Sequence, residues 1–138
     1  IVKLFGADLR EYLAQMQVEI PIVIQDCVSI LMENEEHLSE EGLFRISADS
    51  EELKKYKKLY NAGKRVDLHS VDPHCLSGLI KMYLRELPDP LMTYKLFKLF
   101  KEAYGDYIYT HILFVKFKLL RASKKNIYII IIRQIFSR

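Results

Sequence analysis

A single arginine stands in an otherwise apolar and acidic stretch near the middle of the chain. Arg45 lies in residues 41–47, which read EGLFRIS, and its nearest basic neighbours in sequence are Arg10 and Lys54. A guanidinium is always charged at physiological pH and binds oxyanions through a planar fork of N–H donors. The simpler interpretation is a surface arginine that pairs with one of the nearby glutamates.

A second pair of cations falls on a predicted helix. Lys81 and Arg85 are four residues apart, which places both side chains on one face of the helix, one turn from each other. Like charges at this spacing repel weakly, so we expect an acidic group to lie opposite them. An ordinary exposed pair of cations is the alternative.

Helix signals on both sides place Arg45 on a connection. Apolar residues at helical spacing predict a helix over residues 21–36, which ends before the arginine. Asp49, with Glu52 three residues later, is an N-cap signal for a helix that begins near residue 50. Binding and catalytic groups are frequent on connections of this kind, because a rigid scaffold holds them.

Capping residues predict three further helices. Asp72 followed by Pro73 is a strong start signal for the helix that carries the cation pair. Asp8 caps a short helix near the N-terminus, whose apolar stripe is expected to be core, and Thr93 caps a late helix. Gly63 ends the helix that begins near residue 50. Its lysine-rich face is expected to be solvated, and an electrostatic role is the alternative.

Composition excludes several classes of protein. The chain has 138 residues, half of them apolar, which predicts one folded domain. Its two cysteines, Cys27 and Cys75, have no ligand spacing, so we expect a reducing, cytoplasmic location and a buried Cys27. No stretch reaches the roughly 18 apolar residues of a membrane span.

No motif of a self-contained enzyme is present. Phosphate-binding and dinucleotide-binding glycine loops, HExxH and a Ser/His/Asp order are all missing from the sequence. The four histidines share no ligand spacing, so we expect surface or turn residues and no metal site. They are His37, His69, His74 and His111.

Charge divides the chain into two parts. Residues 1–106 hold all 18 acidic residues and 14 of the 21 basic ones, a net charge of −4, which gives no case for nucleic acid. Residues 107–138 hold 7 basic residues and no acidic one. We therefore expect a helical domain over 1–106 and a divergent basic and apolar segment over 107–138. That segment is either the last helices of the same domain or a truncated or mis-spliced end.

Three stretches together resemble the RhoGAP family, the GTPase-activating domains for Rho-family small GTPases. They are Phe5-Gly6 with Leu9 and Tyr12-Leu13, residues 41–47, and residues 79–91, which read LIKMYLRELPDPL. The resemblance covers residues 5–105. It implies an all-α, multi-helix bundle of RhoGAP type, incomplete at the C-terminus.

The resemblance also implies a role for each cation. Arg45 matches the family's arginine finger. In the family this side chain enters the nucleotide site of a GTP-bound partner in trans and accelerates the partner's GTP hydrolysis. Lys81 matches the residue that contacts the GTPase near its switch region, and Arg85 matches the one that braces the finger loop by hydrogen bonds. Leu43 and Phe44 are expected to anchor that loop. No cofactor belongs to the chain, since GTP and Mg²⁺ sit in the GTPase, so the chain is a regulator rather than an enzyme.

Two departures from the family pattern leave alternatives open. The family usually has glycine at the position of Ala48, which predicts an altered hinge in the loop. Its late helix with a functional asparagine has no match in 107–138, where Asn126 is too poor a candidate to carry the role. The second hypothesis is therefore a module that binds the GTPase without accelerating it. The third is membrane association through the basic tail residues Lys116, Lys118, Arg121, Lys124 and Lys125.

Overall fold

The computed structural model describes residues 2–91 and 93–104. Contacts divide the chain into two units, Ile1–Pro88 and Asp89–Arg138, and each is considered by itself. All the secondary-structure elements assigned in the described residues are helices, as the all-α prediction requires. The predictions for residues 107–138, including an incomplete C-terminus and membrane contact, fall outside the described residues. No helix among the described residues is long and apolar enough to cross a membrane.

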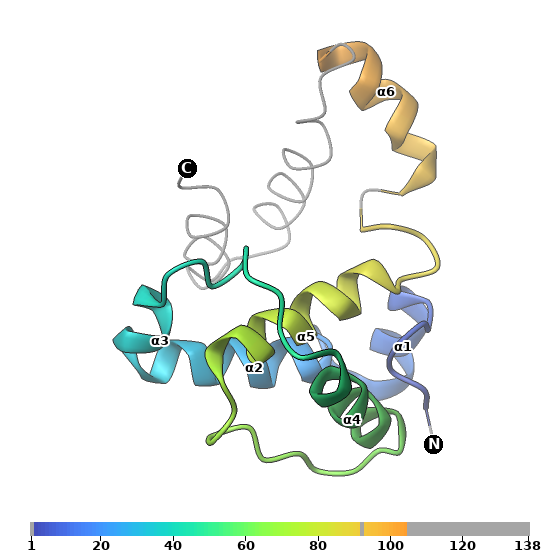
Figure 1. Cartoon of the computed structure of the whole chain (residues 1–138). Helices are drawn as coiled ribbons and strands as arrows, with labels where there is room; N and C mark the ends of the chain where they lie inside the picture. The colour runs from blue at the N-terminus through green and yellow to red at the C-terminus, as the bar shows by residue number, and fades with distance from the viewer. Residues whose placement is uncertain (1, 92, 105–138) are drawn as a thin grey trace. The chain divides into compact units, whose positions relative to one another are not determined.

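The first unit holds five helices, and the described part of the second holds one (Figure 1). They are α1 (Leu9–Met16), α2 (Ile22–Glu33), α3 (Glu35–Ser39), α4 (Ser50–Asn61) and α5 (Pro73–Arg85), followed in the second unit by α6 (Tyr94–Tyr104).

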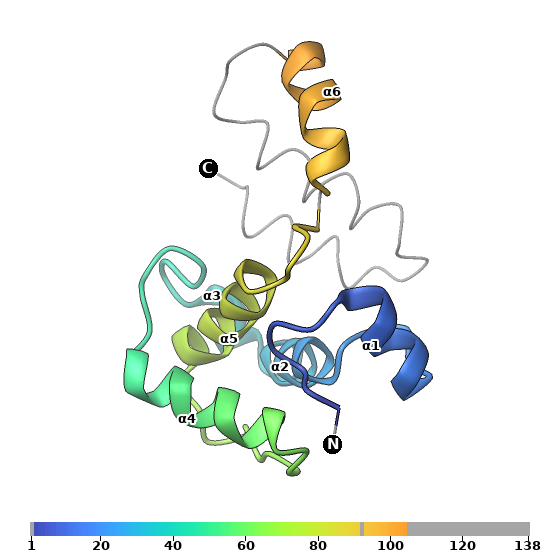
Figure 2. The ribbon, with the colours of Figure 1, turned by 90° about the vertical axis from the view of Figure 1, so that its right-hand side faces the viewer.

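The central helix of the first unit is α5, which packs against both α2 and α4 (Figures 1 and 2). Apolar residues at helical spacing give α5 a broad buried face, and each fully buried side chain contributes about 1.5–3 kcal/mol of hydrophobic stabilisation. Its buried residues are Cys75, Leu76, Ser77, Gly78, Leu79, Ile80, Met82 and Tyr83. Because α5 is buried on several sides, whatever it carries on its remaining face is held on a rigid support.

Most predicted helix ends are confirmed. Asp49 caps α4, since its carboxylate accepts from the backbone N–H groups of Glu51 at 2.7 Å and Glu52 at 3.0 Å. Asp72 caps α5 in the same way, with Pro73 in the first turn. Gly63 follows the end of α4 with a φ of +65°, a left-handed conformation that glycine adopts without a steric penalty.

The helix predicted over residues 21–36 is wrong at its C-terminal end, which lies three residues too late. The structure ends α2 at Glu33 and starts α3 at Glu35, with Asn34 between them in extended conformation. The Asn34 side chain accepts a hydrogen bond from the backbone N–H of Glu36 at 2.9 Å. Asparagine competes with the helix by bonding nearby backbone groups, so it caps a new helix more readily than it continues an old one.

Two other local predictions differ from the structure. The stripe on α1 was expected to be core, and Tyr12 is buried, but Met16 at the end of the helix is 45% exposed. Thr93 was expected to cap α6, but the N–H of Tyr94 donates to the carboxylate of Asp89 at 3.0 Å. An aspartate five residues back has thus taken the place of the nearer hydroxyl.

The N-terminal segment is tied to the end of α4 and to α5. The Asn61 side chain accepts from the backbone N–H groups of Leu4 at 3.1 Å and Phe5 at 2.8 Å. The Phe5 ring meets the Tyr83 ring edge to face, with centroids 5.7 Å apart. The N-terminal segment therefore covers the C-terminal part of α5.

Candidate functional site

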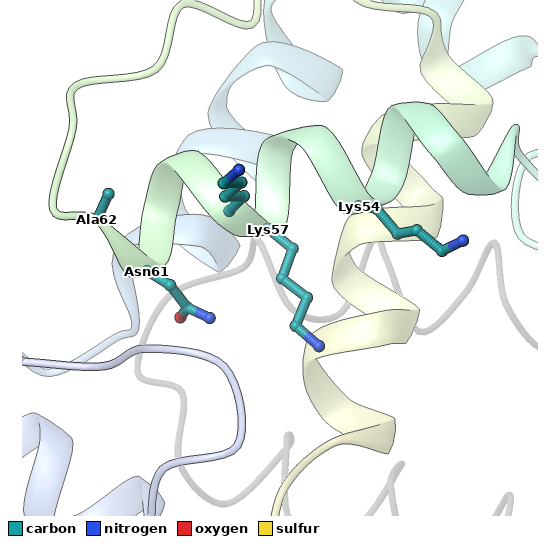
Figure 3. A pocket seen from close by; sticks show the side chains of 5 residues that line it. Lys54, Lys57, Asn61 and Ala62 are labelled. Atoms are coloured by element: carbon teal, nitrogen blue, oxygen red, sulfur yellow. The ribbon is translucent and has the colours of Figure 1, made fainter.

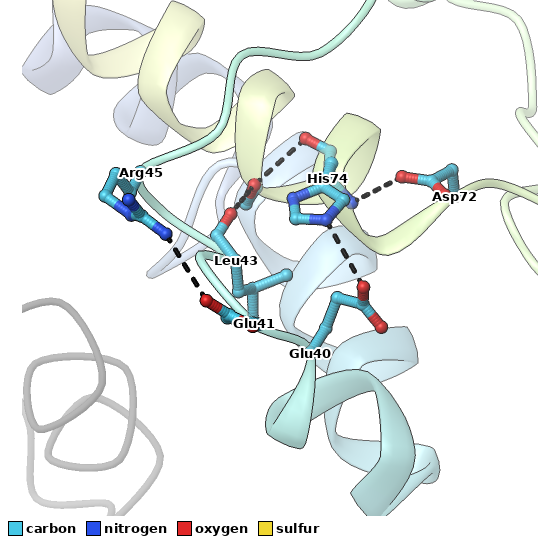
Figure 4. Close-up of polar contacts among 7 residues, drawn as sticks. Glu40, Glu41, Leu43, Arg45, Asp72 and His74 are labelled. Carbon is cyan, nitrogen blue, oxygen red and sulfur yellow. Dashed lines mark hydrogen bonds and ion pairs between the residues drawn. The ribbon is translucent and has the colours of Figure 1, made fainter.

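Arg45 lies on the loop between α3 and α4, with its side chain 66% exposed. The guanidinium is 3.7 Å from the carboxylate of Glu41, which is 81% exposed (Figure 4). The ion pair that the simpler interpretation predicts is therefore present. An exposed pair of this kind contributes only about 0.2–1 kcal/mol, so a stronger anion can replace Glu41 as the partner of the arginine.

The loop is a tight turn built on Gly42. This glycine has a φ of +69°, and its carbonyl accepts from the backbone N–H groups of Arg45 and Ile46, both at 2.8 Å. The turn points Leu43 into the core, where it is buried, and leaves Arg45 and Ile46 exposed. Leu43 thus anchors the loop as expected, while Phe44 is half-buried.

One face of α5 holds the backbone of this loop. The hydroxyl of Ser77 donates to the Leu43 carbonyl. The ammonium of Lys81, one turn further along α5, donates to the carbonyls of Phe44 at 3.2 Å and Ile46 at 3.4 Å. The acidic group expected opposite the cation pair is therefore wrong for Lys81, because backbone carbonyl oxygens of the loop receive its N–H groups instead.

Arg85 is exposed at the end of α5. Among the described residues it makes no hydrogen bond to residues 41–47, so the brace that the resemblance assigns to Arg85 is made by Lys81 in this structure. Burial, and next the positive charge of Arg85, lowers the pKa of Lys81. The two cations thus share one face, as their spacing predicts, but only Lys81 is directed at the loop.

A histidine that the sequence placed at the surface lies beside the loop. The His74 side chain is 17% exposed, and its Nε2 is 3.5 Å from the carboxylate of Glu40, which directly precedes residues 41–47 (Figure 4). The backbone N–H of His74 donates to the capping carboxylate of Asp72 at 2.8 Å. The first turn of α5 is therefore linked to the start of the loop as well.

The lysine-rich face of α4 forms a shallow basic concavity (Figure 3). Lys57 is paired with Glu86 at 2.7 Å, and Lys54 is paired with Glu51 at 2.7 Å. Lys55 lies over the ring of the neighbouring Tyr56, 5.5 Å from its centroid. Lys54, Lys55 and Lys58 are exposed, as the solvated-face interpretation predicts, whereas Lys57 is half-buried against Glu86.

The cysteines do not supply a nucleophile. Cys27 and Cys75 are both free and buried, as expected for Cys27. Burial is the main cause that raises the pKa of both thiols, that of Cys75 to about 12, so neither forms the reactive thiolate at neutral pH. Among the described residues no group of three or more His, Cys, Asp or Glu side chains could hold a metal ion.

The model of the RhoGAP domain family matches residues 21–125. The chain belongs to the RhoGAP domain family. The match contains residues 41–47 and 79–91, and Lys81 of the second stretch donates to the backbone of the first. It also extends beyond the described residues.

Named relatives agree with the family. The chain is 37% identical over 107 residues to Rho GTPase-activating protein 30 of Homo sapiens, covering 75% of this chain and 9% of that protein. It is 43% identical over 95 residues to Rho GTPase-activating protein 17 of Mus musculus, covering 68% of this chain and 11% of that protein. The chain thus spans about a tenth of the length of these relatives.

A solved structure shares the fold of this RhoGAP domain. The crystal structure of human Rho GTPase activating protein 15 superimposes with a TM-score of 0.68 at 24% sequence identity. The superposition covers 96% of this chain and 63% of that one. It supports the all-α bundle that the sequence predicts.

Ser77 is a site residue that the sequence patterns do not single out. Ser77 occupies the apolar stripe of the predicted α5, four residues before Lys81, and it is fully buried. A hydroxyl in such a position needs a hydrogen-bond partner, which was the signal available in the sequence. Nothing in the sequence indicated that this partner is a carbonyl of the loop that presents Arg45.

Proposed function

We propose that this RhoGAP domain binds a Rho-family small GTPase in its GTP-bound form and supplies Arg45 in trans to accelerate GTP hydrolysis. One observation carries the proposal: the Arg45 side chain is two-thirds exposed while α5 holds the backbone on both sides of it. A guanidinium that must enter another protein's nucleotide site needs both properties, reach into solvent and a fixed base. The family membership favours the same partner.

The chemistry is charge stabilisation. Negative charge spreads over the oxygens of the transferred phosphoryl group in the transition state, and a planar guanidinium meets it with several donors at once. Such an arginine accelerates hydrolysis by about 10³–10⁵-fold, which is roughly 4–7 kcal/mol of the barrier. GTP, Mg²⁺ and the attacking water are held by the partner, so the chain acts as a regulator of that enzyme.

Lys81 and Arg85 are proposed to support the finger from the same face of α5. Lys81 has three N–H donors and directs two of them to the loop, which leaves one for an acceptor on the GTPase. Its removal should weaken binding of the GTPase and also slow the stimulated reaction. Arg85 is proposed as a loop-stabilising residue that completes this brace when the partner is bound.

Single-turnover GTP hydrolysis by several Rho-family GTPases tests the proposal. Arg45→Ala should reduce the stimulated rate by at least about 1000-fold while much of the binding is retained. Arg45→Lys should also be poor, since an ammonium lacks the fork. Arg65→Ala is the matched control, because Arg65 is an exposed arginine on another connection, and it should behave like the parent chain.

Two results would contradict the proposal. Stimulation by Arg45→Ala equal to that of the parent would exclude the finger. Binding of the GTP-loaded partner by the parent chain with no acceleration would instead support the binding module, the second hypothesis from the sequence. The rate is measured in this assay, and the affinity is determined separately from direct binding of the GTP-loaded partner, so that binding is observed even where hydrolysis is not accelerated.

A further inference from the structure

The two peptide units that lead into Arg45 are both held by α5. The carbonyl of Leu43, in the first unit, accepts from the hydroxyl of Ser77. The carbonyl of Phe44, in the second unit, accepts from the ammonium of Lys81 at 3.2 Å. Since the donors lie one helical turn apart on the same helix, the direction in which the arginine side chain leaves the backbone is set by α5.

Ser77 has one proton and two carbonyl neighbours. Its hydroxyl oxygen is in hydrogen-bond contact with the Leu43 oxygen and lies 2.9 Å from the oxygen of His74. The His74 carbonyl belongs to α5, where the backbone N–H four residues later is its regular partner. The Leu43 carbonyl belongs to a loop and lies against a fully buried side chain. We therefore assign the hydroxyl proton of Ser77 to the hydrogen bond with the Leu43 carbonyl, because the His74 carbonyl already has its regular partner in the helix.

We propose that Ser77 is a positioning residue for Arg45, holding the Leu43 carbonyl so that the loop presents the guanidinium in one direction. The importance of that direction rests on the proposed function, but the anchoring belongs to the free chain. The hydroxyl is attached to the helix through a single carbon, whereas Lys81 reaches the loop through a flexible four-carbon stem. Without the Ser77 hydroxyl, the loop would be held on α5 by the flexible side chain of Lys81.

Ser77→Ala removes the donor and keeps the rest of the site. We expect the maximal stimulated rate of GTP hydrolysis to fall about tenfold, since a misplacement of about 1 Å costs up to about 100-fold. The chain concentration for half-maximal stimulation should change by less than about twofold, because the exposed surface is unaltered. Ser77→Thr keeps the hydroxyl but adds a methyl group at a fully buried position, so it should recover part of the rate lost in Ser77→Ala.

A stability control separates positioning from general damage. Val23 is fully buried in the first turn of α2, the end of that helix away from α3 and the loop. Val23→Ala should reduce stability by a comparable amount and leave the stimulated rate at the parent value. Amide hydrogen exchange of the free chain gives the second readout. Residues 43–46 should exchange faster in Ser77→Ala and at the parent rate in Val23→Ala.

The outcomes distinguish this inference from the proposed function. Parent-like rate and parent-like exchange in Ser77→Ala would overturn the inference and leave the role of Arg45 intact. Equal slowing by Val23→Ala would overturn it too. If Arg45→Ala stimulates as well as the parent, the proposed function fails, and faster exchange of residues 43–46 in Ser77→Ala would still support the anchor.

Discussion

Replacing Gly78 with alanine tests how the exit of the loop is seated on α5. A Cβ atom at this position would lie 3.0 Å from the Cβ of Ala48 and 3.0 Å from a terminal methyl carbon of Leu53. Both separations are shorter than the roughly 3.5–4.0 Å of a favourable carbon contact. The Leu53 side chain is flexible and can turn away. The Cβ of Ala48 moves only if the backbone after residues 41–47 moves with it.

The size of the effect follows from two opposing terms. Overpacking a core contact costs about 1–3 kcal/mol, and alanine inside a helix gains about 0.5–1 kcal/mol over glycine. Gly78→Ala should therefore lower the free energy of unfolding by roughly 0.5–2 kcal/mol. In an Ala48→Gly background the backbone clash is absent, so the same substitution should be neutral or slightly stabilising. The predicted coupling between the two positions is about 1–2 kcal/mol.

Urea unfolding of the parent, the two single variants and the double variant measures this coupling. Ala14 is an exposed alanine on α1, so Ala14→Gly combined with Gly78→Ala is the matched control and should be additive. Free energies for positions 48 and 78 that add to within about 0.3–0.5 kcal/mol would refute the reasoning, because independent sites behave in that way. Gly78→Ala should also slow stimulated GTP hydrolysis, and Ala48→Gly should restore part of the rate.

Four other outcomes are expected. At about pH 8 a thiol reagent should modify neither Cys27 nor Cys75 in the native chain and both in urea, because burial raises the pKa of each thiol. Tyr60→Phe removes a 2.8 Å hydrogen bond to Asp26 and should lower the free energy of unfolding by about 1–2 kcal/mol. Burial and that bond raise the pKa of Tyr60, so parent stability should fall above about pH 10, where the unfolded tyrosine ionises, and the phenylalanine variant should fall less. Gly42→Ala should cost about 1–2 kcal/mol in thermal unfolding, since alanine is strained at a φ of +69°.

Local signals in the sequence were enough to predict most helix ends. Asp49 and Asp72 act on backbone N–H groups two or three residues away, so the pattern that predicts the cap contains all the atoms that make it. Asn34 carries the same kind of signal, with Glu35 and Glu36 after it, and it ends a helix that apolar periodicity alone predicts to continue. At this position the capping side chain outweighs the periodicity.

The seating of the loop could not be predicted in the same way. Its hydrogen bonds join residues 34 to 37 positions apart, from Ser77 and Lys81 to the carbonyls of Leu43, Phe44 and Ile46. Every residue has a carbonyl, so no pattern of side chains marks the ones that are used. For the same reason, the expectation of an acidic partner for Lys81 was reasonable from side chains alone and still wrong.

Ala48 shows why a residue that departs from a family pattern has to be interpreted together with the residue it faces in the structure, here Gly78. Considered alone, alanine in place of the family's usual glycine predicts an altered hinge after Arg45. In the structure, a Cβ atom added at Gly78 would lie only 3.0 Å from the Cβ of Ala48. We therefore expect the methyl group of Ala48 to fill the space left by the glycine in α5 without a shift of the hinge. If this exchange is what preserves the loop, the two positions must be coupled in stability and in stimulated rate, whereas an altered hinge would leave Gly78 without influence on the arginine.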